Sequence, residues 1–287
     1  MTKITTWKDF ECACAKPGLL FRGQTKHYKK LIPSLFRKEL PANYDSLKEA
    51  AVQLYLKAYQ VYERIESARK RDATPVDPDD FYDDDDDDIW FRGYGPGPVF
   101  GHGFGTSEDH EPAVGVLWFL EDKGHPYRYA ILQHYGAPTP ALDISFNAGV
   151  ALWFATHEFR SDPGGVAHHY QSQECGVVYL ISHSKDLVID LRGKQELPAA
   201  GLRAQRQEGC LLLGVTTQQS DLSHHIVDVL EVDLSVFLSA PASVSSLKQS
   251  YLFPPRNEDL FFDALLNARL SKNETERELG KYFTVYV

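Results

Sequence analysis

The spacing of apolar residues along the chain predicts helices in its first half and strands mainly in its second half. Residues 46–70 carry apolar side chains three and four positions apart, which is typical of an amphipathic helix with Ser46 as its cap. Further helices are expected over 113–133 and 148–159, separated by Pro138 and Pro140, because proline cannot continue a helix. Apolar runs predict a strand at 18–23, later strands at 177–181, 187–191, 210–215, 226–232 and 282–287, and one more helix at 258–270.

This order of elements predicts an α+β fold rather than repeating βαβ units. We expect a mixed, mainly antiparallel β core in the C-terminal half of the chain, with helices packed around it. The 287 residues are enough for one large domain or two modest ones.

Residues 72–111 interrupt this pattern. They contain the unbroken run Asp83–Asp88 followed by a glycine-rich stretch, and they cannot bury enough apolar area to fold by themselves. We therefore expect an acidic Asp/Gly-rich insertion loop. Its aromatic residues argue against a fully disordered segment and indicate that the loop docks on something.

The net charge of −10 is concentrated in the same stretch, because nine of the forty acidic residues lie between Asp77 and Asp88. The remaining surface is nearly balanced, so a basic face for duplex DNA is not expected. A local basic cleft for a single strand or a nucleotide remains compatible with this composition.

The cysteines indicate whether a metal site is expected, and the N-terminal sequence indicates where in the cell the protein is expected. Only Cys12 and Cys14 are close together among the four cysteines, and no second pair completes a structural zinc site, so no metal is expected. Met1–Ile4 leads directly into polar sequence, and no apolar run approaches the roughly 20 residues of a membrane span. We expect a cytoplasmic protein with no membrane contact.

Arg22 is the first candidate for a functional site. It lies in the expected first strand, after Leu20 and Phe21 and before Gly23, where a cation is costly without an anionic partner. It either forms a buried ion pair with an acid of the core or presents its guanidinium at a cleft to bind phosphate or ribose diphosphate. The neighbouring Gln24 and His27 supply further hydrogen-bond donors.

A second group of candidates lies between residues 133 and 145. His134 is expected at the end of a helix, and Thr139 and Ser145 carry hydroxyl groups. Asp143 lies between two aliphatic residues, so it is either paired with a donor or tuned for function. It could also cap the following helix, bind amides of the turn, or pair with Arg22.

The third group precedes the strand expected at 210–215. Gln207 and Glu208 are followed by Gly209, and a carboxylate at such a position can stabilise a developing cation or orient a ribose hydroxyl. The alternative is an exposed loop acid, which is common for glutamate.

These motifs resemble the FRG-domain family, named for its Phe-Arg-Gly motif. The resemblance rests on Phe21–Gln24 with Leu31–Leu35, on Gln133–Thr139 with Leu142, Asp143 and Ser145, on Ala151–Ala155, and on Arg203 with Gln207–Gly209. The chain departs from the family pattern at Pro140, where an arginine is usual, and at Ala141 and Ile144. The resemblance implies a single FRG domain over residues 1–287, with 72–111 as an insertion.

The layout of these motifs is similar to that of the ADP-ribosyltransferases, and this similarity implies a fold, a substrate and roles. The substrate would be NAD, with ADP-ribose transferred to a nucleic acid or protein acceptor. Catalytic roles would fall on Glu208, Arg22, Ser145 and His134. NAD would be contacted by Arg22, Gly23, Gln24, His134, Tyr135, Thr139, Asp143 and Gln207.

The implied biology is that of a microbial toxin or antiphage effector, with an antitoxin or regulatory protein as a further partner. The alternative is a non-catalytic ligand-binding or protein-interaction module. In that case Arg22 and Asp143 form a buried pair, and the acidic loop docks a partner protein.

Overall fold

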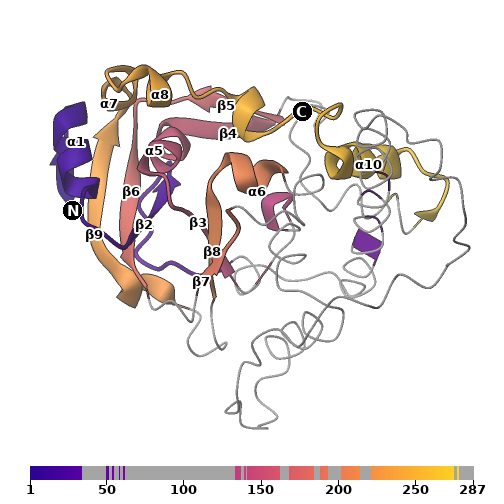
Figure 1. Cartoon of the computed structure of the whole chain (residues 1–287), viewed down its shortest axis with the longest axis horizontal. Coiled ribbons are helices and arrows are strands. Elements are labelled where there is room, and N and C mark those ends of the chain that lie inside the picture. The colour runs from indigo at the N-terminus through magenta and orange to yellow at the C-terminus, as the bar shows by residue number, and fades with distance from the viewer. Residues whose placement is uncertain are drawn as a thin grey trace, which may run out of the picture.

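The computed structural model describes residues 1–33, 133–136, 139, 141–161, 168–183, 188–192, 202–213, 221–274 and 277, together with helical residues 50, 51, 54, 58 and 61 (Figure 1). The expected insertion at 72–111, most of the helices at 46–70 and 113–133, and the strand at 282–287 lie outside the described residues.

A seven-stranded sheet is the centre of the described structure, with the strand order β1-β9-β6-β2-β3-β8-β7. β1 runs parallel to β9, whereas the other neighbouring pairs of this sheet are antiparallel. The strands are β1 (Thr2–Ile4), β2 (Leu19–Gln24), β3 (Ala141–Ser145), β6 (Cys175–Ser182), β7 (Val188–Asp190), β8 (Gly209–Leu213) and β9 (Ile226–Asp233). A separate pair is formed by β4 (His157–Ser161) and β5 (His168–Ser172).

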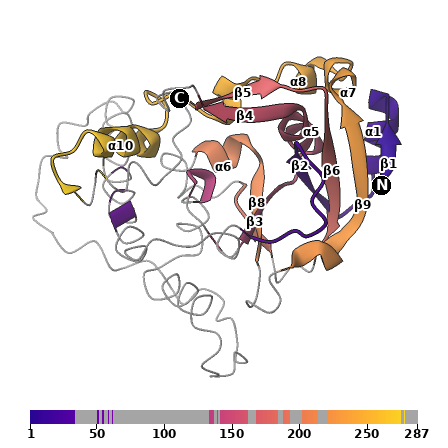
Figure 2. The same ribbon diagram turned by 180° about the vertical axis from the view of Figure 1, so that it is seen from behind.

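The fold class is therefore α+β with a mixed, mostly antiparallel sheet, as the order of elements predicted. The strands expected at 18–23, 177–181, 187–191, 210–215 and 226–232 are all present. The structure differs from the predicted C-terminal β core in two ways. First, β2, from the N-terminal segment, lies in the middle of the sheet (Figure 2). Second, β3 was not predicted as a strand, because two prolines come directly before it.

The described helices pack around this sheet. They are α1 (Trp7–Cys14), α5 (Ala148–Thr156), α6 (Leu202–Arg206), α7 (Leu234–Leu238), α8 (Ala242–Ser245), α9 (Gln249–Leu252) and α10 (Leu260–Arg269), with a 3-10 helix at Leu222–His225. No helix in the described part of the chain is both long and apolar enough to span a bilayer.

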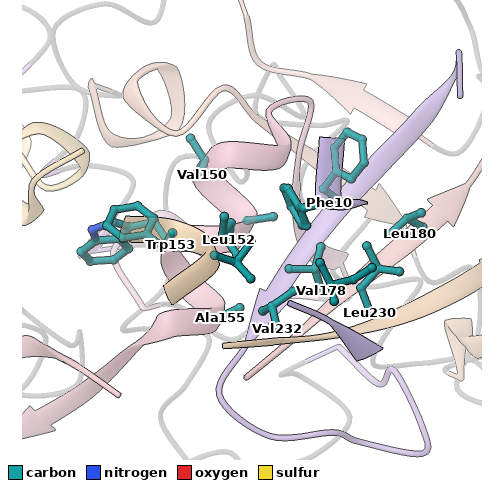
Figure 3. Packing of buried hydrophobic residues seen from close by; sticks show 14 of the residues in the cluster. Phe10, Val150, Leu152, Trp153, Ala155, Val178, Leu180, Leu230 and Val232 are labelled. Atoms are coloured by element: carbon teal, nitrogen blue, oxygen red, sulfur yellow. The ribbon is translucent and has the colours of Figure 1, made fainter. Parts of the chain in front are cut away.

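Alternation of side chains along the strands places an apolar cluster on each face of the sheet. On one face, Phe21, Val178 and Leu180 pack with residues of α1, α5 and α7 (Figure 3). On the other face, Leu20 and Tyr179 pack with further residues, among them Leu31, Leu142, Ile144 and Leu212. The two-residue period of β2 and β6 thus builds both halves of the core.

Helix α5 is buried on nearly all sides, which explains its almost wholly apolar sequence. It begins at Asn147, whose side-chain oxygen accepts hydrogen bonds from the main-chain N–H groups of Gly149 and Val150. Asp143 is therefore not the cap that the sequence left open. The helix ends at Thr156, three residues before the predicted boundary, because His157 begins β4.

Two glycines let α5 lie directly on the sheet. A Cβ atom on Gly23 would lie 1.7 Å from the main-chain oxygen of Ala151, and one on Gly176 would lie 1.9 Å from that of Ala155. Gly23 belongs to β2 and Gly176 to the adjacent β6, and the two alanines are one helical turn apart. The glycine of the Phe-Arg-Gly motif is therefore required by helix packing.

Replacing Gly23 by alanine should reduce the free energy of unfolding by about 3 kcal/mol, because the new methyl group forces α5 away from β2. Urea denaturation measures this cost. Gly18→Ala is the matched control, since Gly18 has a φ of +76° but open space around its Cα, and strain alone should cost about 1–2 kcal/mol. Equal costs for the two variants would contradict the packing explanation.

His157 should make stability depend on pH. Its ring stacks on that of Trp153, with centroids 4.3 Å apart, and its Nδ1 donates to the main-chain oxygen of Trp153 at 2.8 Å. Burial lowers the pKa of His157, and this hydrogen bond only partly offsets the effect. The unfolded chain therefore binds the proton more readily, and stability is lost as pH falls through about 6.5.

Denaturation curves across this pH range check the prediction for His157. The variant His157→Gln should lose part of the pH dependence, whatever its absolute stability, because it removes the titrating group. If the free energy of unfolding changes with pH equally in the variant and in the parent protein, groups other than His157 cause the pH dependence.

Candidate functional site

A cavity of about 210 Å³ lies where β2, β3, α5 and the turn before β8 meet. Its lining includes six of the residues that the sequence singled out, namely Arg22, Gly23, His134, Asp143, Ser145 and Gln207. These residues come from three segments that are far apart in the chain. The structure thus brings the three motifs to one cavity.

Arg22 bridges β2 and β3 at the edge of this cavity. The two strands pair in register at Phe21 and Ser145. One residue further on, Nη1 of Arg22 donates a hydrogen bond to the main-chain oxygen of Asp143. This contact differs from the carboxylate–guanidinium pair that the sequence left open, because it uses the backbone of Asp143.

Asp143 projects toward the face of the sheet that α5 covers. Its neighbours in β3, Leu142 and Ile144, belong to the apolar cluster on the opposite face, and successive residues of a strand alternate. The atom Oδ1 of Asp143 is buried, and none of the described residues donates a hydrogen bond to it. A carboxylate oxygen in this state is costly unless a donor enters the site.

The orientation of His134 is fixed by Gln207. The side-chain amide nitrogen of Gln207 donates to the main-chain oxygen of Leu252 at 3.0 Å, so Oε1 of the same amide must face Nδ1 of His134, also at 3.0 Å. Because an amide oxygen only accepts, Nδ1 carries a proton and donates. These partners assign the tautomer of the neutral ring, in which Nε2 is an acceptor.

Ser145 uses its hydroxyl group within the scaffold. It donates to the main-chain oxygen of Gln207 at 2.7 Å and accepts from the main-chain N–H of Asn147 at 2.9 Å. It therefore links β3, the start of α5 and the turn before β8. This one side chain therefore connects the second motif to the third.

Glu208 lines a different hollow from Arg22. Its φ of +44° turns the backbone between Gln207 and Gly209, and Asn147 donates a 2.6 Å hydrogen bond from Nδ2 to its Oε1. Glu208 lines a neighbouring pocket of about 530 Å³, and Val150 lines both hollows. The structure therefore does not place Glu208 in the cavity of Arg22, His134 and Ser145.

The larger pocket beside Glu208 has mixed charge. Arg206, Lys248 and Tyr251 line it, together with Glu258 and several serines. Arg206 pairs with Glu258 at 3.0 Å and lies over the ring of Tyr251, 4.9 Å from its centroid. Two cations and an aromatic ring thus line this larger pocket.

The other predicted residues lie outside the described lining of the smaller cavity. Thr139 is fully buried, and its hydroxyl donates to the side-chain oxygen of Gln133 within the turn before β3. Gln24 is at the end of β2. Tyr135 is buried and donates its hydroxyl hydrogen to Asp259.

A buried cluster around Arg203 supports the turn before β8. The guanidinium of Arg203 lies 4.4 Å from the ring centroid of Tyr135, 4.5 Å from that of Phe262 and 5.4 Å from that of Phe253. Asp259, also fully buried, caps α10 by accepting from the main-chain N–H of Phe262 at 2.9 Å. Burial raises the pKa of Asp259, and the charge of Arg203 acts in the opposite direction.

The sequence patterns did not indicate that Asp259 or Phe253 belongs to this region, whereas Phe154 lies within the Ala151–Ala155 motif of the family resemblance. Asp259 has a recognisable signal, since an aspartate directly before an apolar helical run is a typical N-cap. Phe154 and Phe253 form aromatic walls of the smaller cavity. Their positions follow from tertiary packing, which a local pattern does not reveal.

Comparison with known proteins adds one match. The sequence model described as FRG domain matches residues 114–163, which include β3 and α5. No curated protein matches the chain, and no solved structure matches it.

The fold and site define an α+β protein in which three polar motifs line one small cavity beside a buried helix. Within this chain, residues 114–163 are similar to the FRG domain, the family that the motifs resemble.

The Asp259–Arg203 cluster predicts a large stability effect. Asp259→Ala should lower the free energy of unfolding by about 2–4 kcal/mol, because it removes both the cap of α10 and the acceptor of the buried Tyr135 hydroxyl. Urea denaturation measures the loss. Asp263→Ala, in the same helix, breaks a more exposed ion pair with Arg256 and should cost less than about 1 kcal/mol. Similar losses for both variants would contradict this account.

Proposed function

We propose that the chain is an enzyme that binds NAD and transfers its ADP-ribose to a nucleic acid or protein acceptor. The observation that supports this most directly is that five polar candidates from three segments line one cavity: Arg22, His134, Asp143, Ser145 and Gln207. Functional residues that converge from distant segments on a hollow are typical of ligand sites.

The size of the cavity suits one end of NAD. A volume of about 210 Å³ is below the roughly 300–1,000 Å³ of pockets that hold whole drug-sized ligands. The nicotinamide ring would lie here, against Phe154 and Phe253, and the nicotinamide ribose would extend past Val150. The diphosphate and adenosine would then occupy the larger pocket, where Arg206 and Lys248 supply positive charge and Tyr251 an aromatic ring.

The position of Glu208 fits this division of the ligand. It lies in the turn between Gln207 and Gly209, which both line the smaller cavity, while its own side chain lines the larger pocket. The bond between the nicotinamide nitrogen and C1′ of the ribose would therefore lie where the smaller cavity meets the larger pocket, beside the Glu208 carboxylate. Asn147 holds this carboxylate in place through Oε1.

The reaction would proceed by displacement at the ribose. The bond between C1′ and the nicotinamide nitrogen breaks, its electron pair leaves with nicotinamide, and an oxygen or nitrogen of the acceptor bonds to C1′ and releases a proton. Glu208 would stabilise the positive charge that develops on the sugar and accept that proton. Arg22 would bind ribose oxygens of NAD, and Ser145 would keep the turn that carries Glu208 in position.

The competing function is a non-catalytic ligand-binding module. The observation that favours it is that Arg22 and Ser145 each use hydrogen bonds to hold main-chain segments together. In this case the cavity would bind a ligand without chemistry.

Binding and turnover can be separated with the purified chain. Calorimetry should detect NAD binding, and chromatography should detect nicotinamide released in the presence of cellular RNA or protein. Glu208→Gln should lower the rate of nicotinamide release by about 10²–10³ while the dissociation constant for NAD changes little, because the lost charge acts on the transition state.

Glu174→Gln is the matched control, since Glu174 is exposed and belongs to neither described pocket lining, and it should retain the parent rate. Mass spectrometry of the RNA and protein should find an added ADP-ribose. NAD binding without turnover in the parent chain would favour the module, and absence of NAD binding would overturn the proposed function.

A further inference from the structure

The geometry points to a specific requirement of the smaller cavity: it selects a ligand ring that carries a primary carboxamide, with its N–H groups donated to Asp143 and His134. This inference rests on the proposed function, because NAD carries such a group on its nicotinamide ring. It assigns selectivity to two named side chains.

The first step concerns Asp143. Its carboxylate lies on the α5 side of β3, lines the cavity, and has a buried oxygen that receives no hydrogen bond from the described residues. Arg22 is bound to the main-chain oxygen of the same residue. A ligand N–H group is the natural complement of such an oxygen, because leaving a buried acceptor unpaired is costly.

The second step concerns His134. Gln207 holds Nδ1 as the donor, so Nε2 of the neutral ring is an acceptor, and this atom is buried without a partner among the described residues. A Cβ atom on Gly209 would lie 3.0 Å from Cε1 and 3.1 Å from Nε2 of this ring. Glycine at 209 therefore leaves this edge of His134 uncovered, and both residues line the cavity.

The third step is charge. The described lining carries one cation, Arg22, and one anion, Asp143, so a neutral polar group is favoured over a charged one. A primary carboxamide has two N–H groups, one for each of the two acceptors. A carboxylate on the same ring has no N–H to donate and would face Asp143 with like charge.

The test compares amide and acid in two pairs of probes. The first pair is NAD and its deamidated form, nicotinic acid adenine dinucleotide, measured by calorimetry. The second pair is free nicotinamide and nicotinic acid, measured by ligand-observed NMR titration. In each pair the amide should bind at least tenfold more tightly, which corresponds to about 1.4 kcal/mol.

Asp143→Asn should reduce this preference to within about threefold, because the amide of asparagine can donate to a carboxylate and carries no charge. Asp190→Asn is the matched control: Asp190 lies on β7, outside the described lining of the cavity, and pairs with Arg192 at the surface. It should keep the tenfold preference. The comparison in the parent chain needs no variant, so it remains decisive if Asp143→Asn does not fold.

The outcomes separate the two proposals. Equal binding of amide and acid would overturn the carboxamide assignment and leave NAD binding intact. A preference for nicotinamide with no binding of either dinucleotide would uphold the assignment and overturn the proposed function. No binding of any of the four probes would overturn both.

Discussion

The contact of α5 with the sheet at Gly23 and Gly176 is the constraint on which the rest of the structure depends. It allows two main-chain oxygens of the helix to approach neighbouring strands closer than any side chain would permit. The helix start is thereby fixed, and Asn147 at that start binds both Ser145 and Glu208. The geometry of both hollows follows from the height at which α5 lies above the strands.

The polar residues around the cavity are held mainly by main-chain atoms. Arg22 binds the backbone of β3, Ser145 binds the backbone of the turn before β8, and Gln207 binds that of Leu252. Such contacts hold these side chains in place and leave Oδ1 of Asp143 and Nε2 of His134 able to accept a hydrogen bond. Side chains held in this way are already ordered, which would reduce the cost of binding the proposed ligand.

The sequence predicted the strands with continuous apolar runs, such as β6 and β9, because their periodicity is strong. It also identified Arg22, His134, Asp143, Ser145 and Gln207, since polar residues beside glycines in apolar surroundings stand out locally. It missed β3, because two prolines and Asp143 obscure a short strand. A local pattern could not predict that Glu208 and Arg22 line separate hollows, because this depends on the left-handed backbone at Glu208 and on tertiary packing.

The segment that carries the family signature, 114–163, supplies β3 and α5 but not the strands on which they lie. β2, β6 and β8 come from residues before and after it. If residues 114–163 were produced alone, α5 would be exposed to solvent although it is apolar around its whole circumference, and aggregation would compete with folding. The matched segment is therefore one part of a larger packed unit, and substitutions in β2 and β6 are tolerated only as far as these strands continue to cover that helix.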